Sequence, residues 1–495
     1  MDNDDVVFAL CSKKLIQGGT VLAVELIIYT GKIQYRNIDF TFMFDGQDLR
    51  LIPPDDKKHQ IEMEWLMTPI GNGCYTFGNS LKMDEPFLIG RCNEDGKKMV
   101  FLTQIGRNIG NYNSVLLIKI AAYIVCKYDR ELIDRISFSS AEIDCIHPVN
   151  QAFKYTMDNT EFRNNGVFSI TTLDFDSTTT DKQTFIVDGK EVQVYFGVSR
   201  KISTKIGEAP VSLTSAMLFE FEPTSDYAFI LRLWHIAREF IRFLCYRKNI
   251  FLSIAEIESP YEGGKHENFA TLHIVDEKGN PETETLKKGR YIKQAYISGS
   301  EGKILTDIAN SFLYTRHFPN TYESGRHIDA SRFIMITAAF EWEFHRAYPD
   351  GVPKKESTAK VETEATEAIL KLIESSSGKL KKKFQFLKKL IKVDSLQTEI
   401  VKIGEDYDDI IGIFGKHLYQ LNDEDLVYSE MGERLANQRN HFAHGDLDKD
   451  FIGLSLLDLI YLEYVIYALQ LKHYGVNNDC IRKSINDLFH LNFAI

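Results

Sequence analysis

An arginine and a histidine stand five residues apart near the end of the chain, where residues 439–444 read RNHFAH. Histidine moves protons near neutral pH, and the planar guanidinium of arginine binds phosphate oxygens. The pair suits RNA cleavage in which the 2′-hydroxyl attacks the adjacent phosphate. His444 is then the base or acid, and Arg439 neutralises the charge on the phosphorane. We therefore consider Arg439 and His444 candidate catalytic residues.

The segment from Glu424 to His444 must position these groups, and its composition, rich in helix formers and free of proline, predicts a helix. At about 100° per residue, apolar and polar side chains fall on opposite faces. The apolar stripe holds Met431, Leu435 and Phe442, and the polar face holds Asn437, Asn440, His441 and His444. Asn440 lies four residues before His444, so its amide can hydrogen-bond and orient the ring. Gly445 is expected to end the helix.

The same spacing limits what one copy of the motif can do. Five residues of an ideal helix turn the side chains of Arg439 and His444 by about 140° relative to each other. One helix therefore does not easily bring both to a single phosphate, whereas two copies that face each other across a dimer axis can. We predict a homodimer through this face.

The string Arg-polar-x-x-x-His, late in an α-helical C-terminal domain, resembles the motif of the HEPN ribonuclease superfamily. The segment 328–341, IDASRFIMITAAFE, resembles the opening helix of its ApeA-like branch, with an acidic residue after an apolar pair. A long β-rich N-terminal region before a helical C-terminal third also fits that branch. The resemblance implies an all-α HEPN helical bundle whose motifs pair at a homodimer interface, in a bacterial protein of antiviral defence by abortive infection.

The resemblance also implies an activity. The chain is expected to be a metal-independent endoribonuclease that cleaves RNA, with tRNA as the leading substrate, and leaves 2′,3′-cyclic phosphate and 5′-hydroxyl ends. No cofactor is expected, and the N-terminal region is expected to sense a phage-derived trigger. The alternative from another class is a catalytically inactive HEPN domain that only dimerises or binds RNA as a scaffold.

Two other interpretations of the motif stay open. Arg439 and His444 could be ordinary surface groups at the end of a helix. His441 and His444 could also bind a metal together with Asp446 and Asp448, because a three-residue spacing on a helix permits this. No further ligand is evident near the motif, so we predict no metal.

The net charge of −12 shows that the chain as a whole is no general polyanion binder, so RNA contact needs local basic surface. The expected helix Lys379–Lys392 has an apolar stripe and a lysine-rich face without an acid. The stripe holds Leu380, Phe384, Leu387 and Ile391, and the candidate RNA-binding residues are Lys381, Lys382, Lys383, Lys388 and Lys389. The alternative is a solvated lysine face.

The composition, 44% hydrophobic and 26% charged, is that of an ordinary water-soluble protein. No apolar run reaches the roughly 20 residues of a membrane helix, and the first residues lack the basic start of a signal peptide. The seven cysteines are scattered without a C-x-x-C pair, which suits a reducing compartment. We expect a cytoplasmic protein without a membrane partner.

Residues 1–165 are rich in β-branched and aromatic residues and predict a β-rich domain, an antiparallel sandwich by its short strands and turns. The expected strands are Val6–Leu10, Thr20–Thr30, Ile33–Phe44, Gln60–Met67 and Lys98–Gln104. The run from Asn93 to Gly96 predicts a hairpin turn. The pattern of Val115–Tyr128 fits either a strand or a helix.

Residues 166–325 predict a second lobe of mixed β and α structure. Its expected strands are Val167–Phe175, Gln183–Ser199, Ser212–Phe221, Phe251–Ile257 and Phe269–Val275, and its expected helix is Asp226–Lys248. No phosphate-binding loop or catalytic group is evident before residue 326. We therefore expect this region to recognise a partner.

Residues 326–495 predict the helical domain, which completes a multidomain α+β fold. The expected helices are Asp329–Tyr348, Ala365–Ser375, Lys379–Lys392, Leu396–Gly404, Asp406–Leu421, the motif helix and Leu454–His473. The charged stretch Val352–Glu362 is expected to be a linker. The tyrosines of the strongly apolar Leu454–His473 are expected to be core residues.

Overall fold

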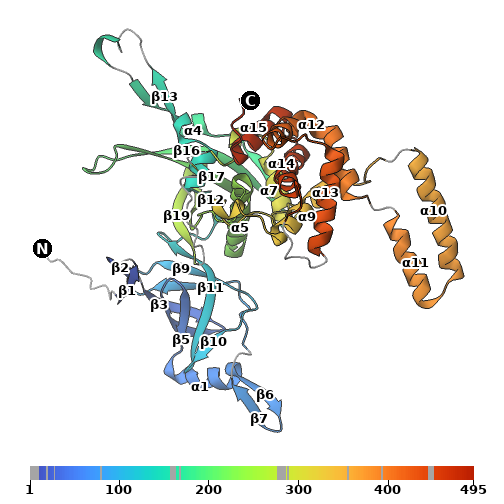
Figure 1. Ribbon diagram of the computed structural model, residues 1–495. Helices are drawn as coiled ribbons and strands as arrows, with labels where there is room; N and C mark the ends of the chain where they lie inside the picture. The colour runs from blue at the N-terminus through green and yellow to red at the C-terminus, as the bar shows by residue number, and fades with distance from the viewer. Residues whose placement is uncertain are drawn as a thin grey trace. The chain divides into compact units, whose positions relative to one another are not determined.

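The computed structural model places the chain in two compact units. It describes residues 11–17, 20–26, 28–77, 81–156, 163–166, 169–275, 286, 289–353, 356–391, 394–443 and 451–494. The first unit comprises Met1–Ile241 and Asn249–Pro281, and the second comprises Arg242–Lys248 and Glu282–Ile495. The fold is mixed α+β, with antiparallel strands in the first unit and helices in the second (Figure 1). The expected domain boundaries at residues 165 and 325 stay predictions. In the two-unit division, residues 282–325 belong to the same unit as the helices that follow.

The strands of residues 29–126 pair into a closed ring. Its members, in pairing order, are β11 (Val115–Cys126), β5 (Asp48–Ile52), β4 (Ile38–Phe44), β3 (Tyr29–Tyr35), β8 (Phe87–Cys92) and β9 (Lys98–Thr103), which pairs again with β11. Alternate residues of β4 are buried, so Phe40, Phe42 and Phe44 fill the centre. The expected turn Asn93–Gly96 joins β8 to β9 and is confirmed.

The open question about Val115–Tyr128 is decided in favour of a strand. The first half of β11 pairs with β5, and its second half pairs with β9 on one side and β19 (Lys265–Ile274) on the other. A register shift between Ile120 and Ala122 lies where these pairings change. β11 therefore belongs both to the ring and to the sheet that follows.

The second part of the sheet continues from β19 in antiparallel order. It runs through β18 (Ile254–Tyr261), β12 (Ile133–Phe138), β17 (Val211–Thr224) and β16 (Lys190–Ile202) to β15 (Gln183–Val187). The expected helix Asp226–Lys248 is confirmed as α5 (Tyr227–Cys245). Its buried Trp234 donates a hydrogen bond to the carbonyl of Leu252, 2.7 Å away. In place of the sandwich, 13 of the described strands form one continuous sheet, and the other six form three separate two-stranded sheets.

The first unit also contains shorter strands and helices outside the two parts of the sheet described above. They are β1 (Cys11–Gln17) and β2 (Thr20–Leu26), β6 (Met67–Gly71) and β7 (Cys74–Phe77), β10 (Gly110–Tyr112), α2 (Ala141–Ile146), β13 (Phe153–Thr156) and β14 (Ser169–Thr172), and α4 (Phe175–Thr178). Val6–Leu10 lies outside the described residues.

Four strand predictions in this unit are wrong. Gln183–Ser199 is two strands, β15 and β16, which pair with each other across the turn at Asp188 and Gly189. Thr20–Thr30 covers β2 and the first residues of β3. Gln60–Met67 is helical through residue 66, as α1 (Lys58–Ile61) and a following π-helical turn. Ile61 and Trp65, four residues apart as on a helix, both pack on the ring core. Ile33–Phe44 is two strands, because Arg36 and Asn37 have φ of 47° and 61° and form the two-residue turn of a hairpin.

The second unit is built from helices. They are α7 (Glu301–Ala309), α8 (Tyr322–Gly325), α9 (Ala330–Ala347), α10 (Glu356–Ser375), α11 (Gly378–Leu390), α12 (Leu396–Gln420), α13 (Tyr428–Ala443), α14 (Ser455–His473) and α15 (Asn478–Phe489). α14 is buried on all sides and packs against α9, α12, α13 and α15. Tyr461, Tyr464 and Tyr467 lie in the core, as expected. None of the helices that the structure describes has the length and apolarity that crossing a membrane requires.

Two helical predictions are wrong. Most of the expected linker Val352–Glu362 belongs to α10, which begins at Glu356 and has no buried residue. The expected break after Gly404 is absent, since α12 runs continuously to Gln420. A Cβ added at Gly404 would lie 2.4 Å from the Tyr428 ring, so this glycine permits α13 to approach α12 closely.

A buried carboxylate on α14 anchors α13. Asp458, with no exposed surface, accepts hydrogen bonds of 2.8 Å from Nε and from Nη2 of Arg434, and a further one from the Tyr419 hydroxyl. Burial raises the pKa of Asp458, and the bonds from Arg434 and Tyr419 act in the opposite direction. A bidentate pair of this kind sets the rotation of α13 against its neighbours.

We predict that removing Arg434 and removing Asp458 lower the free energy of unfolding by different amounts. Arg434→Met leaves the Asp458 carboxylate buried with one donor and should cost about 3–5 kcal/mol of unfolding free energy. Asp458→Asn should cost less, because the Arg434 side chain is 25% exposed and can reach water. Denaturant unfolding measures both. Arg482→Met removes a pair with Asp479, whose side chain is 73% exposed, and one bond to the carbonyl of Asp409; it is the control and should cost about 1 kcal/mol, because no buried charge is left behind. Equal costs for the Arg434 and Asp458 variants would contradict the asymmetry.

Candidate active site

The motif helix α13 has the faces that its spacing predicts. Met431, Leu435 and Phe442 are buried at 0–3% exposure, and Asn437 and Asn440 are exposed. Arg439 lies between the faces, with 38% of its side chain exposed. α13 ends at Ala443, and His444 lies outside the described residues, as do Asp446 and Asp448.

The end of α13 is held from two directions. Gln438, 1% exposed, accepts hydrogen bonds from the backbone N–H of Ile452 at 2.9 Å and from the Ser455 hydroxyl at 3.1 Å. The Phe442 ring packs edge-on against Phe333 of α9, with ring centroids 5.3 Å apart. These contacts fix the backbone on which Arg439 is carried.

Arg439 is paired with a carboxylate from α9. Its Nη1 donates to Oε1 of Glu341, whose side chain is 27% exposed. The expected helix Asp329–Tyr348 is confirmed as α9, with Asp329 as the N-cap that accepts a bond from the N–H of Arg332. Glu341 closes the segment 328–341, so the structure joins the two stretches that the motif analysis selected separately.

A second carboxyl group lies beside this pair. Glu399, in the first turn of α12, is 2% exposed, and its Oε2 has no hydrogen-bond partner among the described residues. Burial raises its pKa to about 8; the charges of Glu341 and Asp394 act in the same direction, and Arg439 lowers it. Nε2 of His345 lies 3.9 Å from Oε1 of Glu399. A carboxyl that titrates near neutral pH is typical of functional sites.

Sequence reasoning missed Glu399. It is one of many acids on an amphipathic helix, and only packing shows that it is buried beside Glu341. A weak local signal existed, because Ser395 and Thr398 form a capping box that starts α12 and places residue 399 in its first turn.

An open hollow adjoins Glu341. Its lining comes from Tyr314, Ala338, Glu341, Trp342, His345 and Arg346. Trp342 is 45% exposed and its Nε1 is bonded to the carbonyl of Phe312 at 2.9 Å, which holds the indole in place. A fixed, exposed aromatic face of this kind can stack on a nucleobase.

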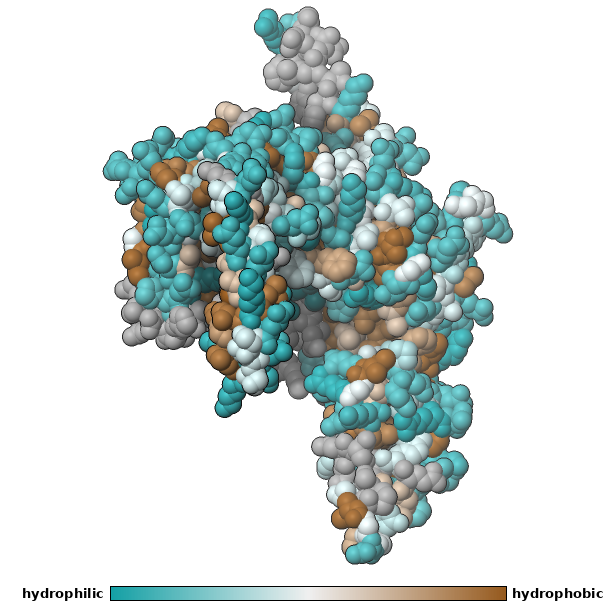
Figure 2. All heavy atoms as spheres, turned by 90° about the vertical axis from the view of Figure 1, so that its right-hand side faces the viewer, coloured by the Kyte–Doolittle hydropathy of each residue, from teal (hydrophilic) through white to brown (hydrophobic). Residues whose placement is uncertain are grey.

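The candidate RNA-binding lysines lie on α11, a different element from the helices that hold Arg439. Lys381, Lys382, Lys383 and Lys389 are exposed and Lys388 is partly exposed. α11 packs against α10, and Leu370 and Phe386 remain 36% and 54% exposed. Figure 2, in which the α10–α11 side faces the viewer, shows such apolar side chains among hydrophilic ones. Lys382, Lys388 and Lys389 line one groove with Leu370 and Phe386.

No group of three or more His, Cys, Asp or Glu residues suited to a metal occurs in the described part of the chain. The alternative metal set of His441, His444 and Asp446 falls mostly outside that part, so it is not tested by this finding.

Comparisons with known proteins add little. Neither a protein-family model nor a curated protein matches this chain. Among solved structures, a glucosamine kinase aligns with 84% of this chain and 92% of its own at 12% identity and a TM-score of 0.11. A score that low carries no argument about fold or function.

Glu399 should make stability depend on pH. Between its ordinary pKa of 4.5 and the folded value of about 8, the folded chain keeps a proton that the unfolded chain has lost. The free energy of unfolding should therefore fall as pH rises through this window. Glu399→Gln should remove this dependence and exceed the wild type at pH 8 by on the order of 1 kcal/mol or more. Thermal or denaturant unfolding from pH 5 to 8 measures the slope.

Glu405→Gln, an exposed change on the same helix, is the matched control and should follow the wild-type profile. Parallel wild-type and Glu399→Gln profiles would show that Glu399 is ionised in the fold at neutral pH.

Proposed function

We propose that this chain is a metal-independent endoribonuclease of the HEPN type that acts in antiphage defence, with tRNA as the first substrate to test. The observation that supports it most is the ion pair between Arg439 and Glu341. It links the arginine of the Arg-polar-x-x-x-His string to the acid of the segment that resembles the opening helix of the ApeA-like branch. These residues are 98 positions apart, so the pair is independent of the motif's local spacing.

In the proposed reaction, the 2′-oxygen bonds to the phosphorus and the bond from phosphorus to the 5′-oxygen breaks. His444 accepts the 2′-proton or supplies one to the leaving 5′-oxygen. Arg439 stabilises the phosphorane: Glu341 occupies its Nη1, and the other guanidinium N–H groups can reach a phosphate. The products are a 2′,3′-cyclic phosphate and a 5′-hydroxyl, and no metal or cofactor takes part.

The proposal includes a homodimer, because on an ideal helix a spacing of five residues turns the side chains of Arg439 and His444 about 140° apart. The exposed amide of Asn440 orients His444, and the lysines of α11 hold the RNA backbone. The β-rich first unit senses a phage-derived trigger in the cytoplasm.

One observation favours a second candidate, a catalytically inactive HEPN scaffold that dimerises or binds RNA. Glu341 already neutralises Arg439, and a salt bridge between helices is also what a purely structural arginine makes. Activity measurements separate the two candidates.

We expect purified protein to cleave RNA in excess EDTA and to leave 2′,3′-cyclic phosphate ends. Arg439→Ala and His444→Ala should each lower the rate by ~10²-fold or more. Asn440→Ala should cost less, because that amide only orients the ring. Arg482→Ala, which removes a guanidinium from α15, is the matched control and should keep full activity. Loss of cleavage in EDTA, or 5′-phosphate ends, would reject this mechanism in favour of a metal-assisted one.

The same two variants test the shared site. If Arg439 of one copy works with His444 of the other, co-expressed Arg439→Ala and His444→Ala chains should form mixed dimers that regain one of two sites. Activity should return to roughly a quarter of wild type, since half of the random dimers are mixed. No recovery in mixed dimers confirmed by mass would show that each copy acts alone.

The lysines of α11 should set the salt dependence of RNA binding. Reversing Lys381, Lys382 and Lys389 to Glu should reduce the log–log slope of affinity against salt by roughly 0.7–0.9 per lost phosphate contact. Reversing Lys303, Lys416 and Lys472, which lie on other helices, is the matched control for net charge. An equal change of slope in both variants, or no change in either, would show that the lysines of α11 are solvated and do not contact the RNA.

A further inference from the structure

The hairpin of α10 and α11 leaves apolar side chains uncovered along both of its helices. α10 has no buried residue, and it packs mainly against α11 (Figure 1). Val361, Ala368 and Leu372 are exposed at i, i+7 and i+11, a spacing that places them on one stripe of α10. Leu380 and Leu387, at i and i+7, form a matching exposed stripe on α11. The valine and the three leucines are between 37% and 63% exposed.

The two stripes form one face of the hairpin. Only residues 376 and 377 separate α10 from α11, so the helices run antiparallel. Ile369 and Phe384 are partly buried where the helices meet, and the exposed stripes lie beside them on the same side. The groove that Leu370 and Phe386 line has none of the stripe residues in its walls. We call the surface of Val361, Ala368, Leu372, Leu380 and Leu387 the arm face.

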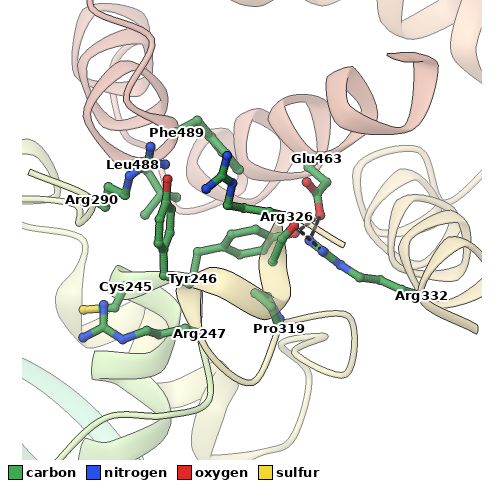
Figure 3. Close-up of a pocket in the computed structure, with 12 residues that line it drawn as sticks. Cys245, Tyr246, Arg247, Arg290, Pro319, Arg326, Arg332, Glu463, Leu488 and Phe489 are labelled. Carbon is green, nitrogen blue, oxygen red and sulfur yellow. Dashed lines mark hydrogen bonds and ion pairs between the residues drawn. The ribbon is translucent and has the colours of Figure 1, made fainter. Parts of the chain in front are cut away.

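Elsewhere in the helical unit, neighbouring elements cover such groups from within the chain. The arginine pocket, between the turn after α5, the loop before α9, α14 and the end of α15, is an example, and its charged lining is Arg247, Arg290, Arg326, Arg332 and Glu463 (Figure 3). Arg332 extends toward Glu463 and donates to it at 2.7 Å, and the Phe489 ring packs edge-on against Tyr246. The arm face is open to solvent instead, although an apolar helix face is stable only when another layer covers it.

The charges of the hairpin indicate what that layer is. α10 has five glutamates and two lysines, whereas α11 has six lysines and no acid. A separate acidic or basic helix would match only one of the two. A second copy of the hairpin, related by a two-fold axis, brings its basic α11 to the acidic α10 of the first copy, and the reverse contact follows by symmetry.

We propose that the arm faces of two copies of this chain pack together into a four-helix bundle, with each α10 against α11 of the other copy. Burial of the valine and leucine side chains favours association, and the opposite charges select which helices meet. Lys382, Lys388 and Lys389 line the groove outside the arm face and stay accessible. This interface is separate from the face of α13 that carries Arg439, and it does not rest on the proposed ribonuclease activity.

The test is zero-length cross-linking of the full-length protein. Isotopically light and heavy chains are mixed in dilute solution, concentrated, and treated with a carbodiimide, which joins a carboxylate to an amine that it contacts. Peptides that link a glutamate of α10 to a lysine of α11 should carry one label from each chain. Sequencing of the linked peptides by mass spectrometry separates these links from links within one chain and from contacts of the α13 face.

A pair of exposed leucines tests the apolar contact. Leu372→Gln with Leu380→Gln should lower the yield of mixed-label links ~10-fold or more, because these side chains no longer favour leaving water. Ile413→Gln with Leu421→Gln, comparably exposed apolar residues in α12 and directly after it, is the matched control and should keep the wild-type yield. Circular dichroism checks that the leucine variant keeps its helix content.

Links that occur only within single chains would overturn the proposal. Mixed-label links that the leucine variant leaves unchanged would overturn it as well. If mixed-label links are absent and added RNA shields the lysines of α11 from the reagent, the hairpin binds RNA in place of a second copy, and the proposal is wrong.

Discussion

The hydrogen bonds to Asp458 are the interaction on which the helical unit depends. α14 is buried all round, and a carboxylate at the centre of such a helix must be satisfied by donors from its neighbours. Arg434 of α13 and Tyr419 of α12 supply them. The bidentate geometry allows one rotation of α13, and that rotation directs Arg439 toward Glu341 on α9. The position of Arg439 thus depends on how the buried Asp458 is satisfied by Arg434, which lies five residues earlier on α13.

Two clusters of charge in this unit are compensated in opposite ways. At the candidate active site acids exceed bases, since Glu341 and Glu399 face Arg439, and the surplus is relieved by keeping Glu399 protonated near neutral pH. In the pocket beside α15 the surplus is positive, and Arg290 cannot lose its proton at any physiological pH. A carboxyl adjusts to its surroundings by titration, whereas a guanidinium requires a counter-charge.

The candidate active site and the arginine pocket share α9. Arg332, in its first turn, pairs with Glu463, and Glu341, about two and a half turns later, pairs with Arg439. α9 also packs along α14. In the first unit, β11 plays a comparable joining part, because its two halves pair with different neighbours. α9 and β11 each contact two different sets of elements. Those long-range contacts determine where the side chains of α9 and β11 point.

The sequence by itself determined the features that repeat over a few residues. The 100° spacing of Met431, Leu435 and Phe442 predicted the buried side of α13, the alternation in Ile38–Phe44 predicted the inward phenylalanines, and the Asn93–Gly96 run predicted a hairpin. Local spacing also selected Arg439 and the exposed lysines. It failed where local pattern is ambiguous, since Gln60–Met67 is apolar enough for a strand but packs as a helix, and Val352–Glu362 looks like a linker but starts α10. Only the tertiary structure decided that Glu341 pairs with Arg439, that Glu399 is buried beside them, and that Arg290 and Arg326 share a pocket. Those relations join residues tens of positions apart, and they arise from packing and from the balance of buried charge, which no local periodicity records.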